Sequence, residues 1–135
     1  MGSEMCIRDR KGSLNELTAV ALSAKILREL RERNSLNTEE IEDVIWGNVT
    51  QVGEQGGCLA RSAVIAANYS ESTPGLSINR FCASGLEAVN LATNQVKGSA
   101  GNAYVAGGVE MMSRVPMGSD GACLLYTSPS PRDIS

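Results

Sequence analysis

The sequence of 135 residues contains no histidine. This absence removes, within the chain itself, every Ser-His or Cys-His catalytic pair and the metal ligand that proteins use most often. Cysteine is also sparse, and no two cysteines have the Cys-x-x-Cys spacing. We therefore expect no disulfide framework and no structural zinc site. The cysteines are Cys6, Cys58, Cys82 and Cys123.

Long hydrophobic runs and an excess of basic charge are lacking as well. No apolar run approaches the ~20 residues that a membrane-spanning helix needs, and no basic segment followed by an apolar one opens the chain. The net charge is −3, from 12 basic and 15 acidic side chains, without the basic stripe of a nucleic-acid-binding protein. We expect neither membrane nor nucleic acid as a partner. The cytoplasm is the expected compartment, or an organelle matrix if a targeting segment has been lost.

What is present is ordinary for a globular protein. Hydrophobic residues make up 42% of the chain and charged residues 20%, which is typical of soluble domains. The length allows one domain at most.

The apolar pattern alternates between helical and extended segments. Residues 14–34 carry apolar side chains at three- and four-residue steps, which predicts a helix that stops near Asn34. A strand is predicted over 44–49 and a helix rich in small residues over 59–67. Between them, residues 53–57 (GEQGG) are predicted to form a loop.

The second half repeats this order. A strand is predicted over 76–79 and another over 103–106. The helix between them has apolar residues on one face and stops at Gly98, a suitable residue for a left-handed cap. The alternation predicts an α/β fold with helices on the faces of a sheet. The apolar face comprises Leu86, Val89, Ala92 and Val96.

Both ends break the pattern. Residues 1–10 (MGSEMCIRDR) have no clean periodicity, and residues 122–135 (ACLLYTSPSPRDIS) shift abruptly to serine and proline. Frayed tails are common in real domains, but both stretches resemble translated adapter sequence joined to a truncated reading frame. We interpret residues 1–10 as a non-native leader and 122–135 as a non-native tail, which leaves 11–121 as the native domain.

The segment Asn79 to Val89 is the candidate for chemistry. It places Cys82 where a strand gives way to a helix, and the N–H groups of a first helical turn carry partial positive charge. A thiolate there is stabilised, which favours nucleophilic reactivity, and nearby N–H groups could hold a developing oxyanion. Residues 83–85 are small and leave room for a substrate. The alternative is an inert, buried cysteine, the commoner role of this residue type.

The residues 79–90, NRFCASGLEAVN, resemble the active-site cysteine segment of the thiolases. Residues 44–57 (VIWGNVTQVGEQGG), followed by Leu59-Ala60-Arg61, are similar to the family's second strand and the loop after it. Residues 106–117 (AGGVEMMSRVPM) resemble the family's Gly-Gly-x-Glu-Ser-Met-Ser segment, except that Met111 replaces the usual serine. With Gly12-Ser13-Leu14, which resembles the end of the N-terminal segment, the likeness covers residues 12–121.

The resemblance implies an acyl-CoA acyltransferase. Thiolases cleave a 3-ketoacyl-CoA with CoA, or condense two acyl-CoA molecules, in pathways such as the β-oxidation of fatty acids. Cys82 would attack the thioester carbonyl and hold the acyl group, with its own N–H in an oxyanion hole. Coenzyme A would be a co-substrate, with no permanently bound cofactor and no metal. The parent protein would be a homodimer or homotetramer.

The resemblance also implies that the chain is a partial N-terminal domain. The family has a mixed, five-stranded sheet whose central first strand would precede Gly12 and whose last strand would follow residue 121, so both are expected to be missing. Its activating histidine and second cysteine belong to the C-terminal half, so we expect the chain itself to be inactive. The alternatives are a ketosynthase-type condensing enzyme and an inert or interaction-only fragment.

Overall fold

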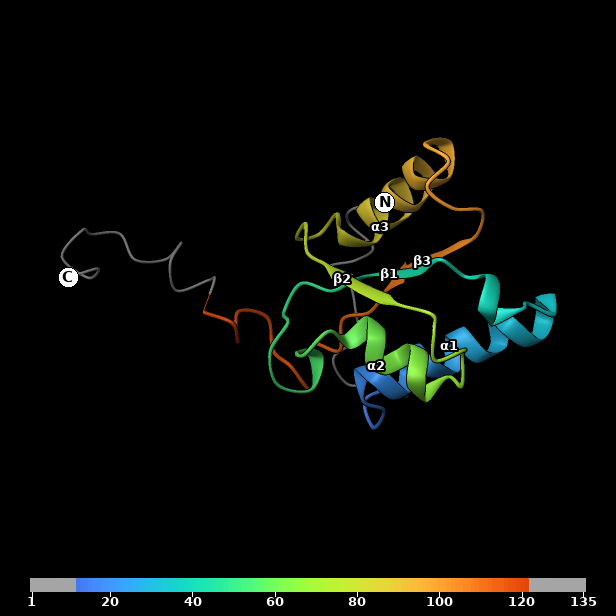
Figure 1. Ribbon diagram of the computed structural model, residues 1–135. Helices are drawn as coiled ribbons and strands as arrows, with labels where there is room; N and C mark the ends of the chain where they lie inside the picture. The colour runs from blue at the N-terminus through green and yellow to red at the C-terminus, as the bar shows by residue number, and fades with distance from the viewer. Residues whose placement is uncertain (1–11, 122–135) are drawn as a thin grey trace, which may run out of the picture.

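A computed structural model describes residues 12–121 (Figure 1). Helices and strands alternate along these residues, as the sequence predicts, which confirms the α/β class. The helices and strands are α1 (Ala19–Asn34), β1 (Asp43–Gly47), α2 (Leu59–Ala66), β2 (Gly75–Ile78), α3 (Ser84–Lys97) and β3 (Tyr104–Gly108), with short 3-10 turns η2 (Thr38–Glu40) and η3 (Gly53–Gln55).

The strands form a sheet in the order β2-β1-β3. Strand β1 pairs in parallel with both neighbours, so that Ile45 lies opposite Leu76 on one side and Ala106 on the other. Within residues 12–121, β1 and β3 pair directly, with no strand between them. Among residues 12–121 every strand pairing is parallel, whereas the expected sheet was mixed. The expected sites of the family's first and last strands, and the predicted leader and tail, lie outside the described residues.

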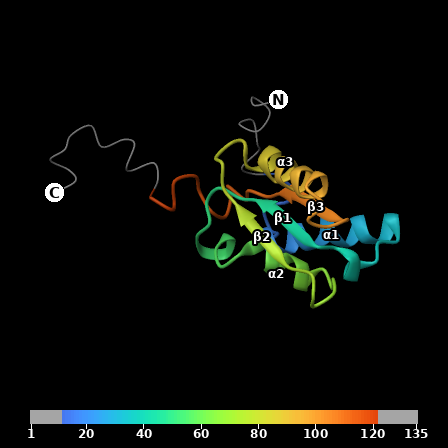
Figure 2. The same cartoon turned by 45° about the horizontal axis from the view of Figure 1, so that its top comes forward.

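Helices cover both faces of the sheet. Helix α3 lies on one face, and α1 and α2 lie together on the other (Figures 1 and 2). Side chains of β1 alternate between the two layers, as the pleat of a strand requires. Val44 and Trp46 join the α1 and α2 side, and Ile45 joins the α3 side.

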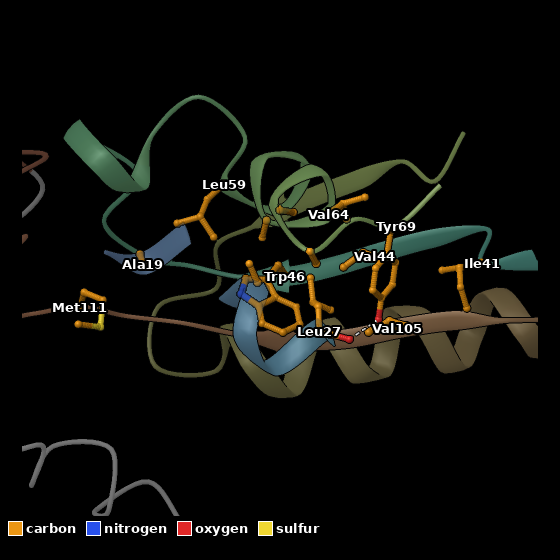
Figure 3. Close-up of a cluster of buried hydrophobic side chains, with 14 residues drawn as sticks. Ala19, Leu27, Ile41, Val44, Trp46, Leu59, Val64, Tyr69, Val105 and Met111 are labelled. Carbon is orange, nitrogen blue, oxygen red and sulfur yellow. Dashed lines mark hydrogen bonds between the residues drawn. The ribbon is translucent and has the colours of Figure 1, made fainter. Parts of the chain in front are cut away.

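The larger core lies between β1 and the pair α1 and α2 (Figure 3). Leu27 and Leu59 are completely buried there, and the buried Trp46 and Tyr69 side chains have partners for their polar atoms. The Trp46 indole donates to Ser23 Oγ at 3.0 Å, and the Tyr69 hydroxyl donates to the Leu27 carbonyl at 2.8 Å. These bonds allow amphipathic rings to be buried without leaving a polar group unsatisfied.

Helix α1 is shorter than the apolar pattern predicts. It begins at Ala19, because the Thr18 hydroxyl accepts a hydrogen bond from Ala21 N at 3.1 Å and caps the first turn. The predicted end at Asn34 is confirmed, and Ser35 follows in the left-handed conformation.

Helix α3 differs from the prediction in two respects. Of the four residues predicted for the apolar face, Leu86, Val89 and Val96 are exposed, at 63%, 48% and 47%, whereas Ala92 packs on the sheet as predicted, beside Ala88. Small alanines allow the helix axis to approach the strands closely. The helix does end at Gly98, but the left-handed residue is Ser99, with φ 57°, and Gly98 has an ordinary φ of −78°. No helix within the described range 12–121 has the length and apolar character to cross a bilayer.

Leu27 and Ile26 provide a matched test of this core. Leu27 is completely buried and Ile26 is 54% exposed. We expect Leu27→Ala to lower the free energy of unfolding by about 2–5 kcal/mol, because it removes buried methyl groups and leaves a cavity. Ile26→Ala is expected to cost less than about 1 kcal/mol. Urea unfolding measures both, and equal losses would contradict the assignment of the core face of α1.

Candidate active site

The ends of the three strands lie together at the carboxyl edge of the sheet, as parallel pairing requires. Asn48 N donates to the Ile78 carbonyl at 2.9 Å, which links the ends of β1 and β2. Val109 N donates to the Gly47 carbonyl at 3.0 Å, which links the ends of β3 and β1. In open α/β sheets, ligands bind outside the carboxyl ends of strands. The segment that carries Cys82 leaves the sheet at this edge, directly after β2.

Cys82 occupies the strand-to-helix junction predicted for it. It is exposed and free, three residues past Asn79 and two before the first residue of α3. Phe81 has a left-handed φ of 48°, and its N–H donates to Asn79 Oδ1 at 2.8 Å. The Ser84 hydroxyl accepts from Arg80 N at 2.8 Å and donates to the Phe81 carbonyl at 2.7 Å. The turn is thus held by hydrogen bonds on both sides of the cysteine.

A close backbone contact places this turn over the end of β1. A Cβ atom added to Gly47 would lie 2.6 Å from the Ser84 carbonyl carbon and 2.8 Å from Gly85 N. These separations are shorter than van der Waals contact, so the first turn of α3 can rest on β1 only because residue 47 has no side chain. A Cβ at Gly85 would meet nothing within 4 Å. The surface beside the cysteine is therefore open, as expected from the small residues at 83–85.

Glu110 joins the loop after β1 to the segment after β3. Its carboxylate accepts from Val49 N at 2.8 Å, Thr50 N at 3.3 Å and Asn48 Nδ2 at 3.3 Å. Gln55 Nε2 donates to the same carboxylate at 3.0 Å. Hydrogen bonds to an ionised acceptor are stronger than neutral ones. The carboxylate therefore fixes the path of residues 48–55 next to the sheet edge.

Gln55 extends this network into the core. It is 1% exposed, and its Oε1 accepts from Met111 N at 2.7 Å. The Met111 side chain is buried in the larger core cluster, so the residue that replaces the family's usual serine serves packing. Neither Glu110 nor Gln55 is among the site residues predicted from the sequence. The available signal was that Glu110 lies two residues after a strand and that Gln55 lies in a loop among glycines.

Arg80 and Arg114 each form an ion pair near this edge. Arg80 lies 3.4 Å from Glu87, and Arg114 lies 2.7 Å from Glu54. The hydrogen bond and charge of Glu54 raise the pKa of the Arg114 guanidinium. At the opposite end of β1, burial raises the pKa of Asp43, although a bond from the Val44 backbone opposes this shift.

The other candidate residues lie apart from this turn. Cys58 is exposed just before α2, in a left-handed conformation, with Sγ 3.2 Å from the Gly75 carbonyl. Cys6 and Cys123 lie outside the described residues. Among residues 12–121 no three His, Cys, Asp or Glu side chains cluster as a metal site would require.

An apolar groove of about 750 Å³ runs between α1 and β3. Leu22, Ile26, Leu30 and Val105 are among its lining residues, and none of residues 79–84 lines it. The groove therefore lies away from the Cys82 turn.

The chain matches the family model described as the N-terminal domain of thiolase over residues 3–127. It is 41% identical over 111 residues to a 3-ketoacyl-CoA thiolase of Colwellia psychrerythraea, covering 82% of this chain. It is 44% identical over 106 residues, or 78% of the chain, to the 3-oxoadipyl-CoA/3-oxo-5,6-dehydrosuberyl-CoA thiolase of Escherichia coli. The matched regions span only 29% and 26% of these two relatives.

The Glu110 network can be tested by its contribution to stability. Glu110→Ala leaves the donors of residues 48–55 without their acceptor and is expected to lower the free energy of unfolding by about 1–3 kcal/mol. Glu71→Ala removes an exposed carboxylate and serves as the matched control, with an expected change within about 0.5 kcal/mol. Chemical denaturation measures both variants. A Glu110 variant as stable as the control would show that the network does not stabilise this edge.

Proposed function

The chain belongs to the thiolase family through its N-terminal domain, and on that premise we propose that its parent protein is an acyl-CoA acyltransferase. The parent would cleave a 3-ketoacyl-CoA with CoA and, in the reverse direction, condense two acyl-CoA molecules. Relatives named 3-ketoacyl-CoA thiolase support this substrate class and a place in β-oxidation. Coenzyme A would enter as a co-substrate.

The observation that carries the proposal is the exposed Cys82 between β2 and α3, within the matched region. In cleavage, the Cys82 thiolate would attack the 3-keto carbonyl, the C2–C3 bond would break, and acetyl-CoA would leave as an enolate that takes a proton, while the acyl group stays on the sulfur. A CoA thiolate would then take the acyl group from Cys82, and condensation would run the same steps in reverse, which is ping-pong chemistry. A cysteine beside a helix N-terminus is by itself weak evidence for a nucleophile. The family match supports the assignment of this role to Cys82.

The remaining chemistry would come from parts of the parent beyond this chain. The chain spans 29% of the length of the curated relative from Colwellia and contains no histidine. A base that activates Cys82 and a group that moves the proton at the substrate α-carbon would both have to be supplied elsewhere. The cytoplasmic location, the absence of membrane and nucleic-acid partners, and the dimeric or tetrameric state stay predictions.

We expect Cys82 to be the acylated residue in the parent protein. Brief incubation with acetyl-CoA should add one acetyl group, and peptide mass spectrometry should locate it on Cys82. Cys58 is the internal control, since it is also exposed and lies just before a helix. Acetylation of Cys58 ahead of Cys82 would overturn the assignment of the nucleophile.

We expect no turnover by the 135-residue chain alone. Removing one positioned acid-base group typically slows a reaction about 10²–10⁴-fold, and this chain has no histidine to supply the family's activating base. The assay adds CoA to acetoacetyl-CoA and monitors thiolysis as the disappearance of the 3-ketoacyl thioester. Turnover above the uncatalysed rate that disappears in Cys82→Ala would contradict this prediction.

A further inference from the structure

We propose that the Ser84 hydroxyl is a positioning group that sets the direction of the Cys82 N–H. The proposal rests on the proposed function, because it takes Cys82 as the nucleophile. Ser84 is 4% exposed, and its hydroxyl makes the two bonds described above, to Arg80 N and to the Phe81 carbonyl.

The bond to the Phe81 carbonyl acts directly on the cysteine. This carbonyl and the Cys82 N–H belong to one peptide unit, which is planar and has the two groups pointing in opposite directions. The Ser84 N–H also donates to this carbonyl, at 3.0 Å. The hydroxyl is the second and shorter donor, and the two together hold the carbonyl oxygen and so fix the direction of the Cys82 N–H. An N–H donor of fixed direction beside the nucleophile is what an oxyanion requires as it develops.

The two bonds run backward along the chain, which distinguishes Ser84 from a capping serine. An N-cap side chain accepts from N–H groups two or three residues ahead. Here the N-cap residue is Ala83, which makes no such bond, and Ser84 is the first helical residue. Its hydroxyl bonds instead to residues 80 and 81. The hydroxyl therefore does not serve to start α3, and its bonds act on the turn that contains Cys82.

The turn needs this support because Phe81 is left-handed, with φ 48°. This conformation is unfavourable for a residue with a side chain and persists only where the surroundings enforce it. Asn79 holds the Phe81 N–H, and Ser84 holds the Phe81 carbonyl. Ser84 is itself seated against Gly47 of β1. The contact with β1 therefore fixes Ser84, and Ser84 in turn fixes the peptide unit between Phe81 and Cys82.

The test compares two reagents on the whole chain. p-Nitrophenyl acetate acetylates a thiol through an oxyanion, whereas iodoacetamide alkylates it by displacing iodide without one. Mass spectrometry reads both reactions at Cys82 and, as an internal reference, at Cys58. We expect Ser84→Ala to slow acetylation of Cys82 relative to Cys58 about fivefold, the factor for one hydrogen bond of average net strength. Alkylation of Cys82 should change less than about twofold.

Ser84→Thr and Ser84→Val form the matched pair. They have the same shape and differ in the hydroxyl, so any strain from the extra methyl group in this buried position affects both. Thr should retain the wild-type acetylation rate at Cys82, and Val should lose as much as Ala. Because the pair shares its packing, it decides the question even if Ser84→Ala alters the fold.

The outcomes separate the two proposals. If acetyl-CoA acetylates Cys58 ahead of Cys82 in the parent protein, the assignment of the nucleophile fails, and the role of Ser84 fails with it. If Cys82 is the acetylated residue there but Thr and Val behave alike in this chain, the positioning role alone is wrong. Equal slowing of acetylation and alkylation in Ser84→Ala would likewise overturn it, because it would indicate a general structural role.

Discussion

Parallel pairing on both sides of β1 is the constraint on which the rest of the structure depends. Parallel strands end at the same edge, so the segments after Gly47, Ile78 and Gly108 meet although they are far apart in sequence. Buried on both faces by helices, β1 also divides the hydrophobic side chains into two layers. A different strand order or direction would separate the Cys82 turn from the loops that surround it.

The candidate site depends on close contacts between backbone segments. A few side chains hold these segments in place by hydrogen bonds. Gly47 lets the first turn of α3 rest on β1, and Ser84 then holds the turn that presents Cys82. At the same edge of the sheet, the Glu110 carboxylate accepts hydrogen bonds from residues 49, 50 and 55 and holds that loop in place. A nucleophile on a loop gains precision when rigid elements hold that loop. The sheet edge supplies this rigidity within the described part of the chain.

Helix α3 shows where pattern reasoning was right for one residue and wrong for the others. Of the predicted apolar face, Leu86, Val89 and Val96 are exposed, whereas Ala92 faces the sheet beside Ala88. A helical period identifies residues that share a face, but it does not state which face packs. Close approach of a helix to a sheet favours small side chains, and that preference depends on the partner surface. The hydrophobic size of a residue therefore misled the prediction here.

The sequence by itself determined the α/β class, the order and approximate bounds of the elements, the family and the place of Cys82 between a strand and a helix. These follow from local periodicity and from contiguous motifs. Only the tertiary structure decided the strand order, the packing face of α3, and the roles of Ser84, Gly47 and Glu110. Each of these depends on contacts between segments distant in the chain, as when Glu110 meets Val49 sixty-one residues away. Short-range patterns carry no information about such contacts, because they arise only when the strands align and bring their ends together.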